Sequence, residues 1–291
     1  MTTLLAVPNV SEGRDRAALD AIGAAFEAGG ARVLDVHADS DHHRAVFTLA
    51  GAPGRLAPAV LEGAREALAR IDVSTHAGAH PRVGAVDVAP IVHLDRASRG
   101  AACAEALVLG DLLGRELDLP VLLYGALAGG RTRAELRRGG PEGLGDRLRA
   151  GELRADFGPA ERHPTAGVAL VAARPPLVAF NLELAPPAGV ADAERIAARI
   201  REGGADGLTG VRALGLELTD RGVAQVSTNV EDPRATPLAV VVEAVRAHAR
   251  VSAAELVGLA PAAAFDGFPD DVPIPGFDPA RHLIERALGD G

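Results

Sequence analysis

The amino-acid sequence predicts an α+β fold built from two subdomains. Short apolar runs rich in β-branched residues alternate along the chain with longer segments rich in Ala and Leu. The predicted order contains βαββαβ stretches, which are typical of α/β sandwiches and not of a doubly wound parallel sheet. A break at Arg174, Pro175 and Pro176 separates the two halves. We therefore expect two ferredoxin-like α/β sandwich subdomains, residues 1–173 and 174–291, facing each other across a ligand cleft.

The first half is expected to contain five strands and three clear helices. Pro53 suits the start of a helix, where its missing N–H leaves no hydrogen bond unmade. A further helical or irregular stretch, Thr132–Ala150, leads into a loop at Asp156–Gly167. The expected strands are Leu4–Val10, Arg32–His37, Ala45–Ala50, Ala85–Val92 and Val121–Tyr124, and the expected helices are Arg14–Ala28, Pro53–Ile71 and Arg99–Leu117.

The second half repeats this pattern in fewer residues. Turn residues at Thr219–Gly222 separate two apolar runs and predict a β-hairpin. A tail rich in Pro, Gly and Asp precedes a last short helix. The expected strands are Ala169–Ala173, Val178–Leu184, Val211–Leu218, Val223–Val230 and Ala254–Leu259, and the expected helices are Ala191–Glu202, Pro237–Ala249 and Pro279–Leu288.

Composition excludes several functional classes. A net charge of −9 argues against general binding of nucleic acid, which needs basic surface. All 30 positively charged side chains are arginine, so Schiff-base chemistry and a phosphate-loop lysine are excluded. The single cysteine, Cys103, allows no intramolecular disulfide and no CxxC metal site. Because no basic leader and no apolar stretch of membrane-spanning length is present, we expect a cytoplasmic protein without a membrane partner.

Five of the nine histidines lie between residues 37 and 80, in two groups. The first group lies in Asp35–Arg44, which runs from one predicted strand into the next, and the second lies in the Gly- and Pro-containing loop His76–Gly84. From the residues alone, three interpretations remain open. The histidines could ligate a metal ion, although their spacing differs from the HxHxDH pattern of metallohydrolases. His42 and His43 could be solvated turn residues. One histidine could act as an acid–base catalyst near neutral pH.

Six sequence blocks together resemble the glutamate formiminotransferase family. They occur in family order over roughly residues 4–265, and HPRVGAVDV with QVSTN is the most specific combination. The resemblance is to the formiminotransferase domain without the cyclodeaminase domain that the animal enzymes carry. The blocks are VPNVSEG (Val7–Gly13), HAGAHPRVGAVDVAP (His76–Pro90), LPVLLYG (Leu119–Gly125), DFGP (Asp156–Pro159), AFNLEL (Ala179–Leu184) and VAQVSTNVED (Val223–Asp232).

The resemblance implies catalysis by the histidine of the HPR motif, here His80, and folate binding by the loop that DFGP begins. His37 stands where the animal enzymes have an acidic residue, so we expect either His37 or a neighbouring aspartate to take that polar role. Gly158, Pro159, Pro164 and Gly167 match the framework of the family's folate loop. The variable or altered positions of that expected folate-binding segment are Ala160, Glu161, Arg162, His163, Thr165 and Ala166.

The implied reaction moves the formimino group of N-formimino-L-glutamate to N5 of tetrahydrofolate in histidine degradation. Tetrahydrofolate is then a co-substrate, and no metal is required. Arg44, Arg82 and Arg174 are candidates for substrate carboxylates, since a guanidinium pairs with a carboxylate bidentately, and Asn9 is a candidate for the cleft. We also expect a homodimer, and a separate cyclodeaminase chain is a candidate partner. Two alternatives are formyl transfer from 5-formyltetrahydrofolate to glutamate, and folate binding without catalysis.

Overall fold

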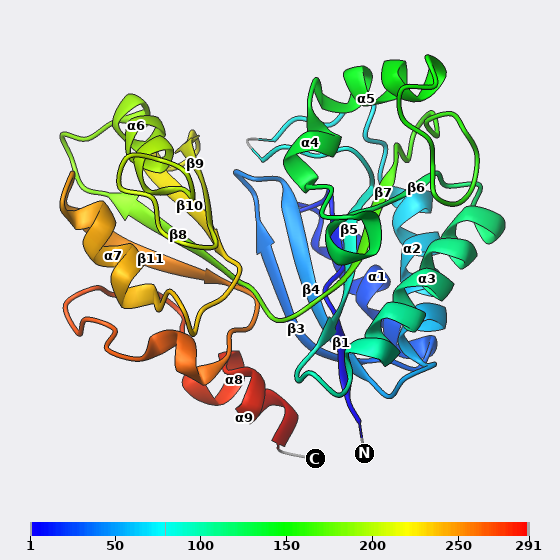
Figure 1. The fold of residues 1–291 in the computed structure, drawn as a ribbon, viewed down its shortest axis with the longest axis horizontal. Helices are drawn as coiled ribbons and strands as arrows, with labels where there is room; N and C mark the ends of the chain where they lie inside the picture. Colours follow the sequence, from blue (N-terminus) through cyan, green and yellow to red (C-terminus); the bar gives the residue numbers. More distant parts are fainter. Residues whose placement is uncertain (1, 79, 290–291) are drawn as a thin grey trace. The chain divides into compact units, whose positions relative to one another are not determined.

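The computed structural model describes residues 2–78 and 80–289. Contacts divide the chain into two compact units, which we call unit 1 (Met1–Pro175) and unit 2 (Pro176–Gly291) (Figure 1). Among the described residues, unit 1 contains a seven-stranded sheet and unit 2 a four-stranded sheet, each with its own helices. The α+β fold that the sequence predicts is confirmed, and each unit is described below by itself.

Unit 1 begins with a βαββαβ arrangement. Its first strand is split into β1 and β2, and the sheet order is β3, β4, β1 with β2, then β5, with every neighbouring pair antiparallel. This order is that of a ferredoxin-like sandwich. The elements are β1 (Leu4–Ala6), β2 (Asn9–Val10), α1 (Arg16–Ala28), β3 (Arg32–Asp39), β4 (Arg44–Gly51), α2 (Leu56–Arg70) and β5 (Val86–His93).

An extension widens this sheet beyond β5. Strand β7 pairs with β5, and β6 pairs with β7, both in parallel. Parallel neighbours need crossover connections, and α3 supplies the first of them, between β5 and β6. The elements of the extension are α3 (Arg99–Glu116), β6 (Val121–Leu123), the 3₁₀ helix η1 (Gly125–Ala128), α4 (Arg133–Arg137), α5 (Gly140–Arg149) and β7 (Ala169–Arg174).

Two hydrophobic clusters lie on opposite faces of the unit 1 sheet. Helices α1, α2 and α3 pack on one face, where Phe26 and Phe47 meet edge to face with ring centroids 5.2 Å apart (Figure 1). On the other face, leucines of α4 and α5 pack against β5, β6 and β7 through residues such as Leu136 and Leu170. The second cluster fixes α4 on the face of the sheet that α1–α3 leave free.

Unit 2 has the same βαββαβ arrangement without an extension. Its sheet order is β11, β8, β10, β9, with all neighbours antiparallel. The predicted hairpin is confirmed, since Leu218 pairs with Val223 across the turn. The elements are β8 (Val178–Leu184), α6 (Val190–Ile200), β9 (Val211–Leu218), β10 (Val223–Val230), α7 (Leu238–Arg246), β11 (Val251–Val257), the 3₁₀ helix η2 (Ala262–Phe265), α8 (Pro279–His282) and α9 (Ile284–Gly289).

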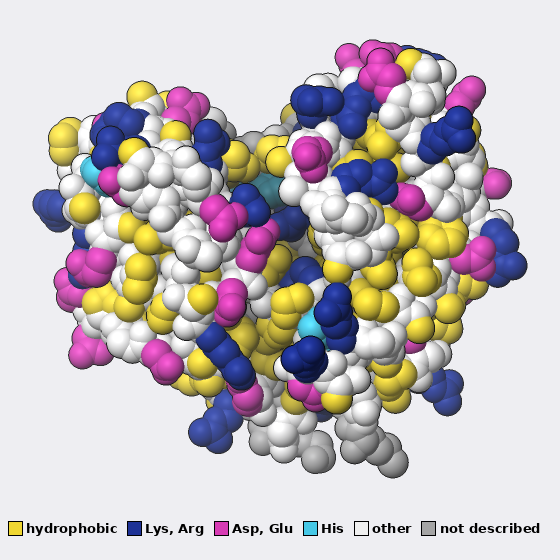
Figure 2. All heavy atoms as spheres, viewed as in Figure 1, with side chains coloured by type: hydrophobic (Ala, Val, Ile, Leu, Met, Phe, Trp, Pro, Cys, Tyr) yellow, Lys and Arg dark blue, Asp and Glu magenta, His cyan; other side chains and the backbone are white. Residues whose placement is uncertain are grey.

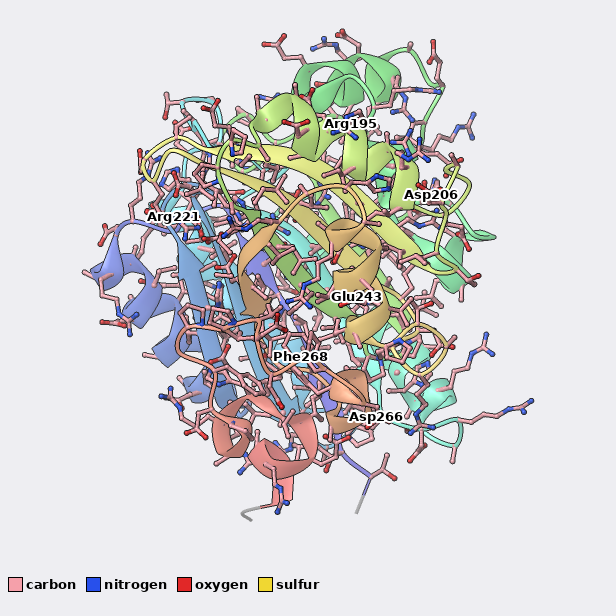
Figure 3. All side chains as sticks on the ribbon, turned by 90° about the vertical axis from the view of Figure 1, so that its left-hand side faces the viewer. Arg195, Asp206, Arg221, Glu243, Asp266 and Phe268 are labelled. Carbon is pink, nitrogen blue, oxygen red and sulfur yellow. The ribbon has the colours of Figure 1, made fainter. Side chains whose placement is uncertain are left out.

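Aromatic residues close one end of the unit 2 core. Phe268 meets Phe180 and Phe265 edge to face, with ring centroids 5.9 and 5.6 Å apart, and Phe265 also lies beside Phe277. Figure 3 faces this unit and labels Phe268 in the segment after η2, together with Arg195 on α6 and Glu243 on α7. Four of the chain's seven phenylalanines therefore stabilise the irregular tail that follows β11.

Two expected elements differ from the structure for local reasons. The single strand expected at Leu4–Val10 is interrupted after Ala6, and Pro8, which lacks an N–H for the ladder, lies in the gap. Helix α2 begins at Leu56 and not at Pro53. Gly54 has φ of +85°, which a right-handed helix does not allow. The buried carboxylate of Glu105 on α3 instead accepts hydrogen bonds from the N–H groups of Gly54 (2.5 Å) and Ala57 (2.7 Å).

On the face shown in Figure 2, acidic and basic side chains are interspersed among apolar ones. Among the described residues, many charged side chains form short-range pairs, such as Arg199 with Asp206 at 2.6 Å. Within residues 2–78 and 80–289, no helix combines the length and the apolarity that crossing a membrane requires.

Candidate functional site

A β-bulge places one carboxylate on the face of the unit 1 sheet opposite α1–α3. Asn9 pairs with Val88 and Val10 pairs with Val86, so Asp87 is an extra residue between two regular pairs. Bulges of this kind redirect a side chain and occur often beside active sites. Asp87 is 0% exposed, and its Oδ1 accepts a hydrogen bond from the Val83 N–H at 2.8 Å.

Two arginines share the other oxygen of this carboxylate. Arg44 Nη1 donates to Asp87 Oδ2 at 2.6 Å, and Arg137 of α4 donates to the same oxygen. Arg44 also donates through Nε and Nη2 to Asn9 Oδ1, at 3.1 and 2.7 Å. Burial alone would raise the pKa of Asp87, but the charges of Arg137 and Arg44 outweigh it and hold that pKa well below its usual range. Asp87 is therefore ionised. Through Arg44 and Arg137 it connects β5 with β4 and α4, and Arg44 extends the connection to Asn9 on β2.

The second histidine group forms a loop that Arg82 holds together. Its guanidinium donates to three backbone carbonyls of the loop, those of His76 (2.9 Å), Gly78 (3.1 Å) and His80 (3.0 Å). Gly78 lies so close to the preceding hairpin that a Cβ there would stand 2.6 Å from the His42 carbonyl oxygen. The loop is thus pinned against the turn between β3 and β4, and the Arg82 guanidinium serves the loop backbone.

His80 is the histidine of this loop that lies beside the arginines. Its Nδ1 is 2.7 Å from the Pro81 carbonyl oxygen, which can only accept, so Nδ1 carries the proton. No described residue hydrogen-bonds to Nε2. Desolvation of the ring, then the positive charges of Arg44 and Arg137, lower the pKa of His80 well below its ordinary value. A neutral imidazole with an available lone pair at Nε2 can accept a proton from a substrate.

His42 belongs to the same neighbourhood. It is 7% exposed, and its ring centroid lies 6.0 Å from that of His80. Its Nε2 is buried without a hydrogen-bond partner among the described residues. The interpretation of His42 as a solvated turn residue is therefore wrong.

His43, His76 and Glu12 form a neighbouring cluster. The two histidine rings stack with centroids 4.0 Å apart, and His43 Nε2 lies 3.1 Å from Glu12 Oε1. Burial and then the charge of Arg82 lower the pKa of His76 to about 4, so this ring is neutral at pH 7. Burial opposes ionisation of Glu12, but backbone N–H groups from Gly13 to Asp15 outweigh it and lower its pKa.

His37 lies on β3 opposite Val46, which pairs in turn with Asn9. Residues directly opposite in antiparallel strands share a face of the sheet, so His37 is on the same face as Asn9. Arg44, two residues before Val46 on β4, is on that face as well. Among the candidates, the structure therefore places Arg44 near His80, joins Asn9 to Arg44 by hydrogen bonds, and places His37 on the same sheet face as Asn9.

Arg174 occupies a different place on this sheet. It pairs with Val92, which pairs with Leu5, whereas the Asn9 position is in register with Val88 and Leu170. Val92 and Val88, the β5 residues in register with Arg174 and with Asn9, are four residues apart, a separation of about 13 Å. Arg174 therefore lies at the other end of the sheet from the Arg44–Asp87–Arg137 network.

The expected folate-binding segment, Gly158–Gly167, is anchored at both ends by close backbone packing. Gly158, with φ of +77°, lies against α3, where a Cβ would stand 3.0 Å from Gly114 Cα. Gly167, with φ of +74°, forms an isolated antiparallel β-bridge with Gly84, the last residue of the histidine loop. Between these ends, Ala160, Glu161, Pro164 and Thr165 are exposed, Pro159, Arg162 and His163 are half-buried, and Ala166 is buried.

A hollow adjoins the first residues of this segment. Gly158 and Ala160 line it from one side and residues at the end of α5 from the other; the remaining lining residues are Leu148, Gly151, Leu153, Arg154 and Ala155. Asp156 holds the start of the segment, because its Oδ2 accepts hydrogen bonds from the Leu123 N–H (2.7 Å) and from Arg131 (2.5 Å).

Asp87, Arg137, Glu12 and His42 were not among the site residues predicted from the sequence. Asp87 had a visible signal, since a carboxylate inside the apolar run VGAVDVAP needs a buried partner. Arg137 had no signal, because nothing in its surroundings distinguishes it from neighbouring surface arginines. Within the described parts of the chain, no group of three or more His, Cys, Asp or Glu side chains is arranged to hold a metal ion.

The fold and the site together define an α+β protein in which a neutral histidine lies beside a buried Arg–Asp–Arg network. Comparison with known proteins is more specific. A family model described as the formiminotransferase domain, N-terminal subdomain, matches residues 3–174, and one described as the formiminotransferase domain matches residues 179–266. The chain belongs to the formiminotransferase family.

Relatives in three organisms are similar over most of the chain. A glutamate formimidoyltransferase of Streptococcus pyogenes is 34% identical over 97% of both chains. One of Thermoplasma acidophilum is 32% identical over 99% of this chain and 98% of the relative. A formimidoyltransferase-cyclodeaminase of Gallus gallus is 39% identical over 88% of this chain but 49% of the relative, so the matched region spans about half of that longer protein.

Proposed function

We propose that the protein is a glutamate formimidoyltransferase. It transfers the formimino group of N-formimino-L-glutamate to N5 of tetrahydrofolate and releases 5-formiminotetrahydrofolate and glutamate. Family membership and the names of the full-length relatives support this class of transferase. The mechanism depends on the surroundings of His80. Its Nδ1 donates to the Pro81 carbonyl oxygen, no described residue hydrogen-bonds to its Nε2, and Arg44 and Arg137 lie nearby.

His80 serves as the proton shuttle of the proposed reaction. N5 of tetrahydrofolate is a neutral amine that attacks the formimino carbon, forming the N5–C bond. The tetrahedral intermediate then carries one proton too many on N5 and one too few on the glutamate nitrogen. His80 Nε2 takes the first proton and returns it to the glutamate nitrogen, the C–N bond breaks, and glutamate leaves as an amine. Such a shuttle contributes about 10²–10⁴-fold to the rate.

The lowered pKa of His80 suits the second half of this shuttle. Desolvation and the neighbouring arginines make the imidazolium a stronger acid than usual, so it gives its proton readily to a poorly basic nitrogen. Positioning of the two substrates must supply much of the remaining acceleration.

Other parts of the proposal rest on the family resemblance. We propose that Gly158–Gly167 contacts folate, that His37 takes the polar role of the acidic residue found in the animal enzymes, and that the protein acts as a homodimer in the cytoplasm, in histidine degradation. The exposed positions Ala160, Glu161 and Thr165 are consistent with a segment that can meet a ligand.

The proposal is tested by comparing two donors on the purified protein. Formiminoglutamate with tetrahydrofolate is assayed beside 5-formyltetrahydrofolate with glutamate, each with His80→Ala and with a control variant, His93→Ala, whose ring hydrogen-bonds locally to the Asp95 carbonyl. We expect formimino transfer that falls by about 10²–10⁴-fold in His80→Ala and is unchanged in His93→Ala.

The other outcomes separate the alternatives. Transfer from the formyl donor alone keeps His80 as the shuttle and assigns the protein to folate salvage. Folate binding with neither transfer identifies a non-catalytic folate-binding protein. Equal losses of folate affinity and of turnover in His80→Ala would show that His80 binds a substrate and is not the shuttle.

A further inference from the structure

Helix α4 carries two arginines that face the same way. Arg133 and Arg137 are four residues apart, so their side chains lie on one face of the helix. Arg137 reaches the buried Asp87 carboxylate. Arg133, one turn earlier, places its guanidinium carbon 5.7 Å from the centroid of the Tyr124 ring, at the end of β6. The face of α4 thus continues the Arg44–Asp87–Arg137 network towards Tyr124.

Positive charge exceeds negative charge in this network. Arg44 interacts electrostatically with Arg137 and with Arg133, while Asp87 is the carboxylate that Arg44 and Arg137 share. Burial first, and then the charges of Arg137 and Arg133 against the opposing effect of Asp87, lower the pKa of Arg44. Among the described residues, Arg133 has no acidic partner. Guanidinium groups stay charged in proteins, so the excess charge persists and favours an anion.

Buried polar atoms beside these arginines lack hydrogen-bond partners. The Tyr124 side chain is 6% exposed, and no described residue hydrogen-bonds to its hydroxyl group. The same is true of Arg137 Nε. A buried donor without a partner destabilises a fold, and native structures contain few of them. A ligand that accepts hydrogen bonds would satisfy both donors and offset the positive charge.

We infer that Arg133, Arg137 and Tyr124 bind a carboxylate of a glutamyl group. A guanidinium and a phenol hydroxyl are both donors, and a carboxylate accepts from an arginine bidentately. Arg137 also lies within electrostatic reach of His80, so a carboxylate here is held near the proposed shuttle. The inference rests on the proposed function, since a glutamyl carboxylate occurs both in formiminoglutamate and in the tail of folate.

Arg133→Gln is the most direct test. It removes a charge that has no acidic partner, and Asp87 keeps both of its arginines. Arg138→Gln is the matched control, because Arg138 is exposed and adjacent on the chain. Tyr124→Phe is a second variant that keeps the ring and deletes a hydroxyl with no partner, so folding should be unaffected. Circular dichroism melting curves establish that each variant is folded.

Binding is measured by calorimetry with L-glutamate and, separately, with 5-formyltetrahydrofolate. We expect Arg133→Gln to weaken one of these ligands by about 10–100-fold, Tyr124→Phe to weaken the same ligand by less, and Arg138→Gln to leave it unchanged. If glutamate is the affected ligand, the carboxylate belongs to the donor. If the folate is affected, and the pteroate analogue without a glutamyl tail is insensitive to Arg133→Gln, the carboxylate belongs to the folate tail.

Kinetics provide a readout that a structural role would not reproduce. Loss of a binding contact raises KM for the affected substrate and leaves kcat nearly unchanged. Unaltered affinities in Arg133→Gln, or no binding of either ligand to the unaltered protein, overturn the inference. A protein that transfers no formimino group but loses glutamate affinity in Arg133→Gln refutes the proposed reaction and retains the carboxylate site.

Discussion

The two units share one topology and use charge in different ways. Both place four antiparallel strands in the order of a ferredoxin-like sandwich. Unit 1 buries Asp87 completely between two arginines, whereas pairs at the surface of unit 2, such as Arg246 with Asp271 at 2.7 Å, remain accessible to water. The buried charges of unit 1 depend on features outside the shared topology, namely the bulge in β5 and helix α4 of the extension. The shared topology therefore acts as a scaffold, and the buried ion network of unit 1 also needs Arg137 from the extension that unit 2 lacks.

The largest expected effect on stability comes from the buried network. Asp87→Asn keeps the shape of the side chain but leaves Arg44 and Arg137 without their carboxylate. Breaking a buried ion pair from one side costs about 3–5 kcal/mol, because the remaining charge is buried without compensation. Urea unfolding followed by circular dichroism is the suitable measurement, since the chain has no tryptophan and one tyrosine.

Arg246→Gln in unit 2 is the matched control for this comparison. Solvent screens ion pairs at the surface, so the unfolding midpoint of this variant should hardly move. Similar losses in the two variants would mean that burial does not distinguish the charges of the two units.

A smaller effect is expected from two glycines that both have positive φ. Gly158 has φ of +77°, and a Cβ there would stand 2.5 Å from the Leu119 carbonyl oxygen, whereas Gly222, in the unit 2 hairpin, has φ of +63° and open space around it. Gly158→Ala should cost about 1–3 kcal/mol through strain and collision, and Gly222→Ala less, through strain alone. Thermal melts compare the two. A greater loss in Gly222→Ala would contradict the close packing of the Gly158 segment on α3.

The smallest effect concerns pH. His76 has a pKa of about 4 in the folded protein against an ordinary 6.5, so the unfolded chain binds more protons between these values. Its neutral ring therefore stabilises unit 1 above pH 6.5, and this contribution is lost as pH falls from 6.5 towards 4. His80, whose pKa is also lowered, acts in the same direction.

Unfolding midpoints measured across this range should fall with acidification, and less steeply in His76→Gln. The exposed pair His248–Asp206 of unit 2 supplies the control variant His248→Gln. An identical pH profile in His76→Gln and the unaltered protein would contradict the assignment of this dependence to His76.

Much of the fold could be predicted because strands and helices leave local patterns. The bounds of β8, β9 and β10 were predicted to the residue, since turn residues flank each apolar run. The last helix was predicted as one element, Pro279–Leu288, but forms α8 and α9 with a break at Leu283. The strand expected at Ala254–Leu259 begins earlier, at Val251, because pairing with β8 extends it.

The site was predictable only where residues adjacent in sequence make it. The HPR loop and His80 are visible in the sequence, whereas the partners of Asp87 come from positions 43 residues before it and 50 after it. The bulge cannot be predicted from the sequence of β5 alone, because it is defined by the pairing of β5 with β2. Tertiary pairing, and not local propensity, determines which arginines become buried.

The bulge in β5 also places an apolar strand and a buried charge side by side, because a single residue, Asp87, interrupts the regular pairing. Val86, Ala89 and Ile91 face the core beneath α1–α3, and Val88 faces the opposite cluster. If Asp87 is removed from this series, Val86, Val88, Ala89, Pro90 and Ile91 alternate between the two faces as an ordinary strand does. Apart from Asp87, every residue from Val86 to Val92 is apolar. One extra residue in an otherwise regular apolar run therefore supplies the buried carboxylate to which Arg44 and Arg137 bind.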